Sequence, residues 1–337
     1  MMISRSDRAS LLSILAQFPR QRVTLLGDMV ADEFIDGEIV RVSREAPVLI
    51  LKQREKTILP GGGANAANNL ADLGAKVTPV GVAGDDEAGE ALLHYFLQKG
   101  ISISSILRLR NHVTPTKCRI LGGLSHWQRQ QIVRVDREPS EPLPPSIRRR
   151  LSQKAASLMH RASALLISDY GYGAASAEAV TAIQRRARRR AIPVTVDSRF
   201  DLLSYSHVTA MTPNEPEVEE AFQQKIGNNV SVLHGLGRKL RRRQSLEALL
   251  VTRGRDGMVL FEAGREPKHL PVFGSDQAVD VTGAGDTVIA AFTLALASGA
   301  SFLHAAQLAN CAGGIVVMKR GTATVTASEL KEAIRNA

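Results

Sequence analysis

A run of small residues ends in an aspartate at residues 280–287, Asp-Val-Thr-Gly-Ala-Gly-Asp-Thr. The run leads directly into a segment that is predicted to be helical, so its backbone N–H groups could converge on an anion at the helix N-terminus. Asp286 would lie in the first helical turn, where the helix dipole should keep its carboxylate ionised. A carboxylate beside a bound phosphate can accept the proton of an attacking hydroxyl. The alternative is an ordinary glycine-rich turn in which Asp286 only begins the helix.

A second glycine-rich segment lies near the N-terminus. Three consecutive glycines, which include Gly62 and Gly63, permit a backbone path that side chains would block, and Asn65 follows them. The Asn65 amide offers both a donor and an acceptor, which suits sugar hydroxyls. Asp28 and Asp32 come just past a predicted first strand, where carboxylates can hold vicinal hydroxyls. The alternatives are a plain loop-to-helix turn for the glycines and turn or cap chemistry for the two aspartates.

The elements that would position these residues alternate between short apolar runs and helical periodicity. This pattern is typical of an α/β fold with a mostly parallel sheet covered by helices. We predict strands at residues 23–26, 77–82, 164–168, 193–197, 248–252 and 258–261, the last two as a hairpin. We predict helices at residues 63–73, 85–99, 284–298 and 302–318, and one that ends near residue 187. Residues 139–145 are rich in proline and are interpreted as a connection.

Two segments, at about residues 33–52 and 114–135, have β-type patterning without helices between their strands. We expect them to form a small separate sheet, a lid over the C-terminal edge of the main sheet, where ligands bind in open α/β folds. The chain would then be a single domain over residues 1–337 with the lid inserted in it. Exposed strand edges of such a lid could pair with a second copy, which predicts a homodimer.

The composition excludes several classes of protein. Hydrophobic residues make up 44% of the 337 residues, enough for a core of its own, whereas an aromatic share of 4% counts against a base-stacking nucleic-acid surface. The formal charge of +10 is concentrated in residues 185–190 and 238–243, each at the end of a predicted amphipathic helix. The helix dipole favours cations there. We interpret both clusters as solvated helix ends; the alternatives are nucleic-acid binding and a general attraction of anionic substrates.

The sequence favours a soluble, cytoplasmic protein. Cys118 and Cys311 form neither a disulfide framework nor a metal-binding spacing, which suits a reducing compartment. The apolar group at residues 11–15 is too interrupted for a signal peptide, and no apolar stretch is long enough to span a bilayer.

Taken in order, the separated motifs resemble the ribokinase-like (PfkB) carbohydrate kinases over nearly the whole chain. The motifs are Gly-Asp-x-x-x-Asp, Gly-Gly-x-Asn, Asn-x-x-Glu at residues 214–217 and Thr-Gly-Ala-Gly-Asp. The resemblance implies a ribokinase-like fold and transfer of the γ-phosphoryl group of ATP to a sugar hydroxyl.

The resemblance also implies roles for individual residues. Asp286 would be the catalytic base, and the amides of Gly283, Ala284 and Gly285 would stabilise the transferring phosphoryl group. Asn214 and Glu217 would organise Mg²⁺ and phosphate, Glu217 through water. The nucleotide would bind along Thr252, Gly254 and Gly257 and beside Asn310. Asp280 matches a loop that binds a monovalent cation such as K⁺ in some members.

Residues 42–47, 114–119, 130–136, 168–173 and 319–325 resemble a subgroup, the bacterial D-glycero-D-manno-heptose-7-phosphate kinases. Those enzymes phosphorylate the anomeric hydroxyl of heptose 7-phosphate on the route to nucleotide-activated heptose for lipopolysaccharide. The resemblance implies sugar-side contacts from Asp28, Asp32, Gly62, Gly63, Asn65, Lys117, Arg119, Arg134, Asp169 and Arg199. For the three cations at 117, 119 and 134, the alternative is that they are solvated lid charges.

The chain departs from this subgroup at two positions. Tyr172 stands at the lysine of Asp-Tyr-x-Lys-Gly, and Asp197-Ser198-Arg199 replaces Asp-Pro-Lys. An arginine can still bind phosphate, whereas a tyrosine supplies no cation. Other acceptors therefore stay open: another sugar, a sugar phosphate or a nucleoside. A catalytically silent sensor of sugar or nucleotide is a further alternative. The sequence has no His-x-Gly-His nucleotidyl-transfer motif, so we expect a kinase without adenylyltransferase activity.

Overall fold

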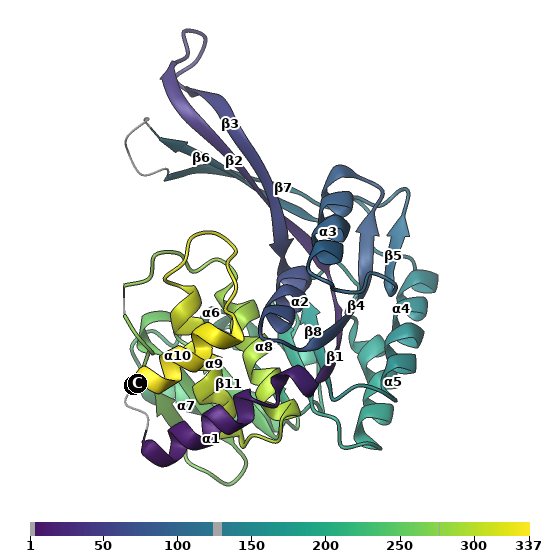
Figure 1. Cartoon of the computed structure of the whole chain (residues 1–337), viewed down its shortest axis with the longest axis vertical. Coiled ribbons are helices and arrows are strands. Elements are labelled where there is room, and N and C mark those ends of the chain that lie inside the picture. The colour runs from purple at the N-terminus through teal and green to yellow at the C-terminus, as the bar shows by residue number, and fades with distance from the viewer. Residues whose placement is uncertain (1–3, 124–129, 276) are drawn as a thin grey trace.

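The computed structural model describes residues 4–123, 130–275 and 277–337 (Figure 1). Within these ranges, nine strands form the main sheet in the order β13-β12-β11-β10-β9-β8-β1-β4-β5. The strands from β5 to β11 are parallel, and β11, β12 and β13 form antiparallel pairs, which confirms the predicted hairpin. Their bounds are β1 Arg22–Gly27, β4 Lys76–Gly84, β5 Ile106–Leu109, β8 Ala164–Asp169, β9 Val194–Ser198, β10 Ala210–Met211, β11 Ala248–Thr252, β12 Met258–Glu262 and β13 Lys268–Leu270.

Helices cover both faces of the main sheet, as predicted. Successive strand side chains point to opposite faces, so Leu25 of β1 lies in one apolar core and Leu26 in the other. The first core is completed by α1 Arg5–Leu15, α2 Gly62–Asp72, α3 Glu87–Gln98, α8 Ala284–Ala297, α9 Phe302–Val316 and α10 Ala327–Asn336. The second is completed by α4 Pro145–Leu158, α5 Ala177–Arg188, α6 Glu215–Phe222 and α7 Val230–Arg243. Because both faces are covered, the central strands are continuously apolar, and this makes them easy to recognise in the sequence.

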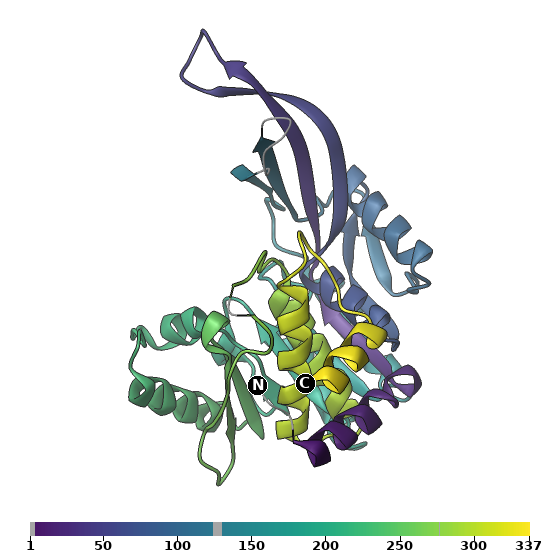
Figure 2. The same ribbon diagram turned by 60° about the vertical axis from the view of Figure 1, so that its left-hand side comes forward.

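The smaller sheet, called the lid sheet below, consists of β3, β2, β6 and β7 in that order in the described part of the chain. Its strands are β2 Met29–Val42, β3 Leu49–Gly61, β6 Thr116–Gly123 and β7 Gln130–Arg137. The sheet leaves the main body where β1 ends and projects well beyond it (Figures 1 and 2). β2 pairs with β6 in parallel, and the other two pairings are antiparallel.

The lid strands run further than the two predicted segments. β3 continues nine residues past residue 52, through a stretch whose residues 52–56 are exposed. A strand with water on both faces has no apolar alternation, so its sequence carries little strand signal. Residues 124–129 of the second predicted segment lie outside the described residues.

The structure adds terminal elements and locates the basic clusters. The apolar group at residues 11–15 belongs to α1, which packs against α10. The arginines of residues 185–188 and 241–243 lie in the last turns of α5 and α7, as expected of cations at helix ends. In the described residues, no helix has both the length and the apolar character needed to cross a membrane.

Candidate active site

The segment before α8 is shaped around a glycine. Gly283 is the N-cap of α8 and has φ 76°, a left-handed conformation that favours glycine. A Cβ at Gly283 would also lie 2.5 Å from Asn65 Nδ2, which is too close. Gly285, in the first turn, faces open space, because a Cβ there would meet no atom within 4 Å. Of the three predicted amide donors, that of Ala284 already donates to Val281 O at 3.2 Å.

Asp286 lies in the first turn of α8, as predicted, and its carboxyl is buried, with 2% of the residue exposed. Its Oδ1 accepts a hydrogen bond from the Tyr170 hydroxyl (2.9 Å), and its Oδ2 accepts one from Asn65 Nδ2 (2.8 Å). Burial, with repulsion from Asp197 next, raises the pKa of Asp286 to about 7 despite these two donors. The expectation that the helix dipole alone keeps this group fully ionised is therefore wrong. Loss of hydration outweighs the dipole.

Asp286 opens into a cavity of about 580 Å³, called the aspartate cavity below. It lies at the C-terminal ends of the parallel strands β8 to β11, the predicted edge of the sheet. It brings together eight of the predicted site residues: Asp169, Arg199, Asn214, Glu217, Thr252, Gly283, Gly285 and Asp286.

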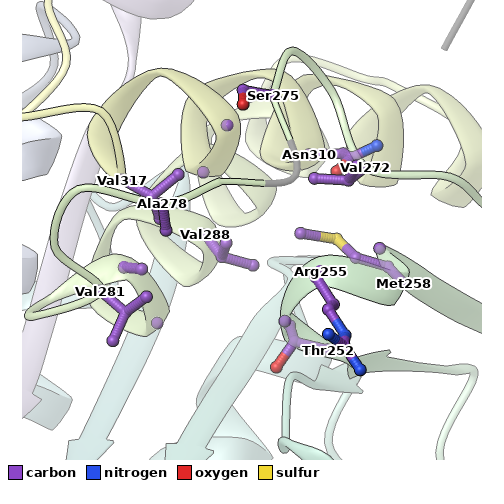
Figure 3. Close-up of a pocket in the computed structure, with 16 residues that line it drawn as sticks. Thr252, Arg255, Met258, Val272, Ser275, Ala278, Val281, Val288, Asn310 and Val317 are labelled. Atoms are coloured by element: carbon purple, nitrogen blue, oxygen red, sulfur yellow. The ribbon is translucent and has the colours of Figure 1, made fainter.

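A second cavity of about 390 Å³, called the apolar cavity, adjoins the first (Figure 3). Both cavities are lined by Thr252, Val281 and Gly285, so they meet at the start of α8. The apolar cavity contains the predicted residues Thr252, Gly254, Gly257 and Asn310. Valine and methionine side chains form much of its wall, which suits a flat ring system: Met258, Val272, Val281, Val288 and Val317.

Asn214 and Glu217 form a capping box at the start of α6. Glu217 N–H donates to Asn214 Oδ1, and Asn214 N–H donates to Glu217 Oε2, both at 2.9 Å. Burial raises the pKa of both Glu217 and Asp197, and repulsion by Glu217 raises that of Asp197 further. No three metal-ligating side chains cluster among the described residues. The carboxyl of Glu217 in this cavity fits Mg²⁺, which keeps several waters and is commonly held by one or two carboxylates and completed by substrate phosphates.

The two N-terminal aspartates are already hydrogen-bonded in the structure. Asp28 is buried and accepts the backbone N–H groups of Tyr170, Tyr172 and Ala174 at 2.8–3.1 Å, so it anchors the loop after β8. Asp32 Oδ2 accepts a hydrogen bond from the Thr322 hydroxyl (2.8 Å).

Asp32 also forms an ion pair with Arg119 (2.6 Å). The side chain of Arg119 is only 12% exposed, so this lid cation is bound to a carboxylate and is not merely solvated.

Two other predicted cations, Lys117 and Arg199, lie close to Asp286, and Arg134 lies close to Lys117. The Lys117 ammonium lies over the Tyr170 ring, 4.9 Å from its centroid. Burial, followed by repulsion from Arg199 and then from Arg134, lowers the pKa of Lys117. Arg199 lines the aspartate cavity, and Arg134 pairs with Asp136 on β7 at 2.9 Å. This arrangement places two cations among the carboxyls that surround Asp286.

Tyr170 and Asp197 also line the aspartate cavity and were not among the predicted site residues. Each follows or ends a buried parallel strand, the one local signal that could have identified them. The neighbouring Tyr172, at the position of the subgroup's lysine, donates its hydroxyl to Glu138 Oε1 at 2.7 Å. The hydroxyl of Tyr172 is thus engaged outside the aspartate cavity.

Residues 22–329 match the profile of the pfkB family of carbohydrate kinases. The chain belongs to this family. Curated relatives include proteins named "Bifunctional protein HldE" from Pelobacter propionicus (37% identity over 97% of the chain) and Hahella chejuensis (39% over 95%). The chain spans 66% and 65% of the length of these relatives. The family assignment agrees with the predicted membership of the carbohydrate kinases and with the resemblance to the heptose kinases.

Solved structures support the fold. Escherichia coli phosphofructokinase-2 in complex with potassium superposes with a TM-score of 0.74 at 18% identity, and covers 94% of this kinase and 98% of that chain. Arabidopsis thaliana ribokinase with ribose and ATP gives 0.70 at 19%, covering 94% and 99%. At these identities the likeness concerns the fold, and it confirms the predicted ribokinase-like architecture.

Proposed function

We propose that this kinase transfers the γ-phosphoryl group of ATP to a sugar that already carries a phosphate, with the anomeric hydroxyl of heptose 7-phosphate as the specific acceptor. The observation that carries the proposal is the position of Lys117 and Arg199 beside the buried carboxyl of Asp286. The neighbouring carboxyls of Asp32, Asp197 and Glu217 partly offset these cations. A phosphate on the acceptor would give both cations a direct partner in the cavity, and charge-assisted contacts to phosphate are the stronger class of hydrogen bond.

ATP would place its base in the apolar cavity and its phosphates at the start of α8, where the two cavities meet. The N–H groups of Gly283 and Gly285 lie at this helix start, where an anion can bind, whereas that of Ala284 already donates to Val281 O. Gly283 and Gly285 let the phosphates approach the backbone, and Asp286 would accept the proton of the attacking hydroxyl. Mg²⁺, when bound, would neutralise charge on the phosphates, and Glu217 would hold it through water.

A monovalent cation near Asp280 is a further part of the proposal. The Asp280 carboxylate accepts N–H groups from Thr282 and Gly321, each at 2.9 Å, so it joins the loop before α8 to the loop after α9. One structural neighbour was solved in complex with potassium. We therefore propose that K⁺ supports the conformation of the segment that leads into α8.

The acceptor is tested by ATP consumption with heptose 7-phosphate and with its unphosphorylated parent. We expect a strong preference for the phosphorylated sugar, and a KM for it that rises roughly 10- to 150-fold in Arg199→Ala while the KM for ATP changes little. Arg134→Ala tests the lid cation in the same way. Arg265→Ala removes an exposed arginine that pairs with Glu262 outside both cavities, and it should leave both constants unchanged.

A wild-type preference for the neutral sugar would reject the phosphorylated acceptor. In that case Tyr172, which supplies no cation, was the better guide to the substrate.

We also propose that two copies of the kinase associate through their lid sheets in the cytoplasm. All eight residues of the edge strand β7 are exposed. Exposed apolar side chains gather on this sheet: Val40, Val42, Val48, Leu49, Ile132, Val133 and Val135. An exposed edge strand with apolar side chains invites pairing. Cys118 and Cys311 are unpaired, in keeping with a reducing compartment.

A further inference from the structure

Tyr170 and Asn65 each donate a hydrogen bond to a different oxygen of the Asp286 carboxyl. Tyr170 follows β8 and donates to Oδ1 of Asp286 at 2.9 Å, whereas Asn65 lies on α2 and donates to Oδ2 at 2.8 Å. Each carboxyl oxygen therefore has its own donor. Two donors on two different elements fix both the position and the rotation of the carboxyl plane.

Both donors are themselves held in place. Asn65 Oδ1 accepts from Asn69 Nδ2 at 3.1 Å, which keeps its amide nitrogen turned toward Asp286. The backbone N–H of Tyr170 donates to the buried carboxyl of Asp28 at 2.8 Å. The Tyr170 ring lies so close to Gly62 that a Cβ there would be 3.2 Å from two ring carbons. Gly62 and Asp28 thus act together to place one phenol hydroxyl.

We propose that Tyr170 is a positioning residue for the catalytic base: its hydroxyl holds Oδ1 of Asp286 so that a free lone pair of the carboxylate faces the acceptor hydroxyl. The inference rests on the proposed role of Asp286 as the base. A carboxylate has about four acceptor positions, so the two donors still leave room for the sugar. In this proposal, Asp28 and Gly62 hold Tyr170 in place and so position the base indirectly.

The proton balance of the step is simple. The O–H bond of the sugar breaks as its oxygen bonds to the γ-phosphorus, the bond from that phosphorus to ADP breaks, and the proton moves to Asp286. Tyr170 keeps its own proton, because burial and the neighbouring carboxylate of Asp286 raise the pKa of the phenol well above its usual value. Tyr170 therefore orients the base and stabilises its ionised form.

Several charged groups act on Asp286 in addition to the neutral hydroxyl of Tyr170. Asp197 on β9 and Asp32 on β2 raise its pKa, while Lys117 on β6 is a nearby cation that favours the carboxylate. The hydrogen bond from Tyr170 lowers the pKa. Removing the hydroxyl should therefore raise the pKa of Asp286.

The experiment is a titration of Asp286 by infrared difference spectroscopy in wild type, Tyr170→Phe and Tyr172→Phe, with Asp286→Asn identifying the band. It needs no sugar, so it does not depend on the identity of the acceptor. We expect Tyr170→Phe to shift the titration upward by about one pH unit, the scale of one charge-assisted hydrogen bond. Tyr172→Phe is the control: it removes a hydroxyl from the same loop, but that hydroxyl donates to Glu138 and not to Asp286. It should leave the titration unchanged.

The pH dependence of kcat/KM provides the kinetic counterpart. The acidic limb of Tyr170→Phe should move upward by the same amount, so the ratio of its rate at pH 6 to its rate at pH 9 should be about 10-fold lower than in wild type. Unchanged titration and an unchanged limb in Tyr170→Phe would overturn the proposal. If Asp286→Asn instead kept full turnover, the role of Asp286 as the base would fail, whatever Tyr170 does.

A second variant covers the case in which Tyr170→Phe does not fold. 3-Fluorotyrosine at position 170 preserves the shape of the ring and has a more acidic hydroxyl, which is a stronger donor. It should shift the Asp286 titration downward, opposite to phenylalanine. A downward shift supports the proposal, and no shift contradicts it.

Discussion

Opposing effects act on the Asp286 carboxyl. Burial and the carboxyls of Asp197 and Asp32 favour its neutral form, while donors from Asn65 and Tyr170 favour the ionised form. The result is a pKa of about 7, close to the range in which a general base is most effective. A buried base lowers the stability of the fold when it is ionised. A variant without the charge of Asp286 should therefore lose catalytic activity and gain stability.

The variant is Asp286→Asn, which removes the charge and keeps the shape. Catalysis should fall by about 100-fold or more, because a positioned general base contributes that much. In wild type, kcat/KM should rise with pH through about 7 as Asp286 ionises. Steady-state kinetics over pH 5–9 measure both effects. Turnover near the wild-type level in Asp286→Asn would remove the residue from this role.

The same variant should be more stable than wild type at pH 8. The folded-state pKa of about 7 lies above the usual 3.8, so the ionised carboxyl destabilises the fold progressively as pH rises from about 4 to 7. Asparagine removes this penalty, which should raise the free energy of unfolding by about 1–3 kcal/mol at pH 8 and little at pH 4. Denaturant melts at the two pH values provide the measurement. Glu332→Gln, at an exposed acid of α10, should show no such difference.

At the scale of elements, the first turn of α8 is where the two cavities meet. Gly283 ends the preceding loop and so determines where this turn begins, and the packing of α8 against α9 and α2 holds the helix in place. Gly285 lies at this meeting point, and it is exposed and has an ordinary negative φ. Its missing side chain is therefore required neither by the backbone nor by neighbouring atoms. Space for a ligand is the remaining physical reason for a glycine.

Gly285→Ala tests this directly. Alanine should not lower stability, because it favours helix over glycine, but its methyl group would occupy the space where the phosphates approach. We expect kcat/KM to fall at least roughly 10-fold, since loss of contacts to a transferring group is severe. Gly235→Ala is the matched control, an exposed helical glycine of α7 with equally open surroundings. It should be at least as stable and fully active. Equal activity of the two variants would contradict a phosphate site at Gly285.

At the scale of the whole molecule, the lid sheet projects from the body with one edge strand, β7, exposed along its length (Figures 1 and 2). A small projecting sheet buries little apolar surface on its own, and several valines on it are about half exposed. Association with another lid would cover these side chains and pair the edge.

The proposed dimer can be broken at β7. Light scattering should show a dimer for wild type at micromolar concentration, and the double variant Val133→Asp, Val135→Asp should be monomeric. The two side chains lie two residues apart in β7 and so share a face, and a buried interface would not tolerate their charges. Val230→Asp introduces the same change at an exposed valine of α7 and should leave the dimer intact. A monomeric wild type would contradict association through the lid sheets.

Local features of the sequence determined the positions of the central strands, the start of α8 and the family of this protein. Short runs rich in apolar residues identify β1, β8 and β11, because strands covered on both faces need no polar alternation. The small residues before Asp286 determine where α8 begins, since the left-handed Gly283 is a local requirement of the backbone. The order of the motifs was sufficient to identify the family and its fold.

Only the tertiary structure decided the properties that depend on distant residues. Tyr170 and Asp286 are 116 positions apart, and their hydrogen bond follows from the meeting of β8 with α8. The raised pKa of Asp286 follows from burial and from Asp197, neither of which a local motif records. Asp28 has the sequence signature of a sugar ligand, yet its carboxyl anchors the loop that carries Tyr170. The physical reason is that backbone conformation depends on neighbours in sequence, whereas desolvation and charge depend on neighbours in space.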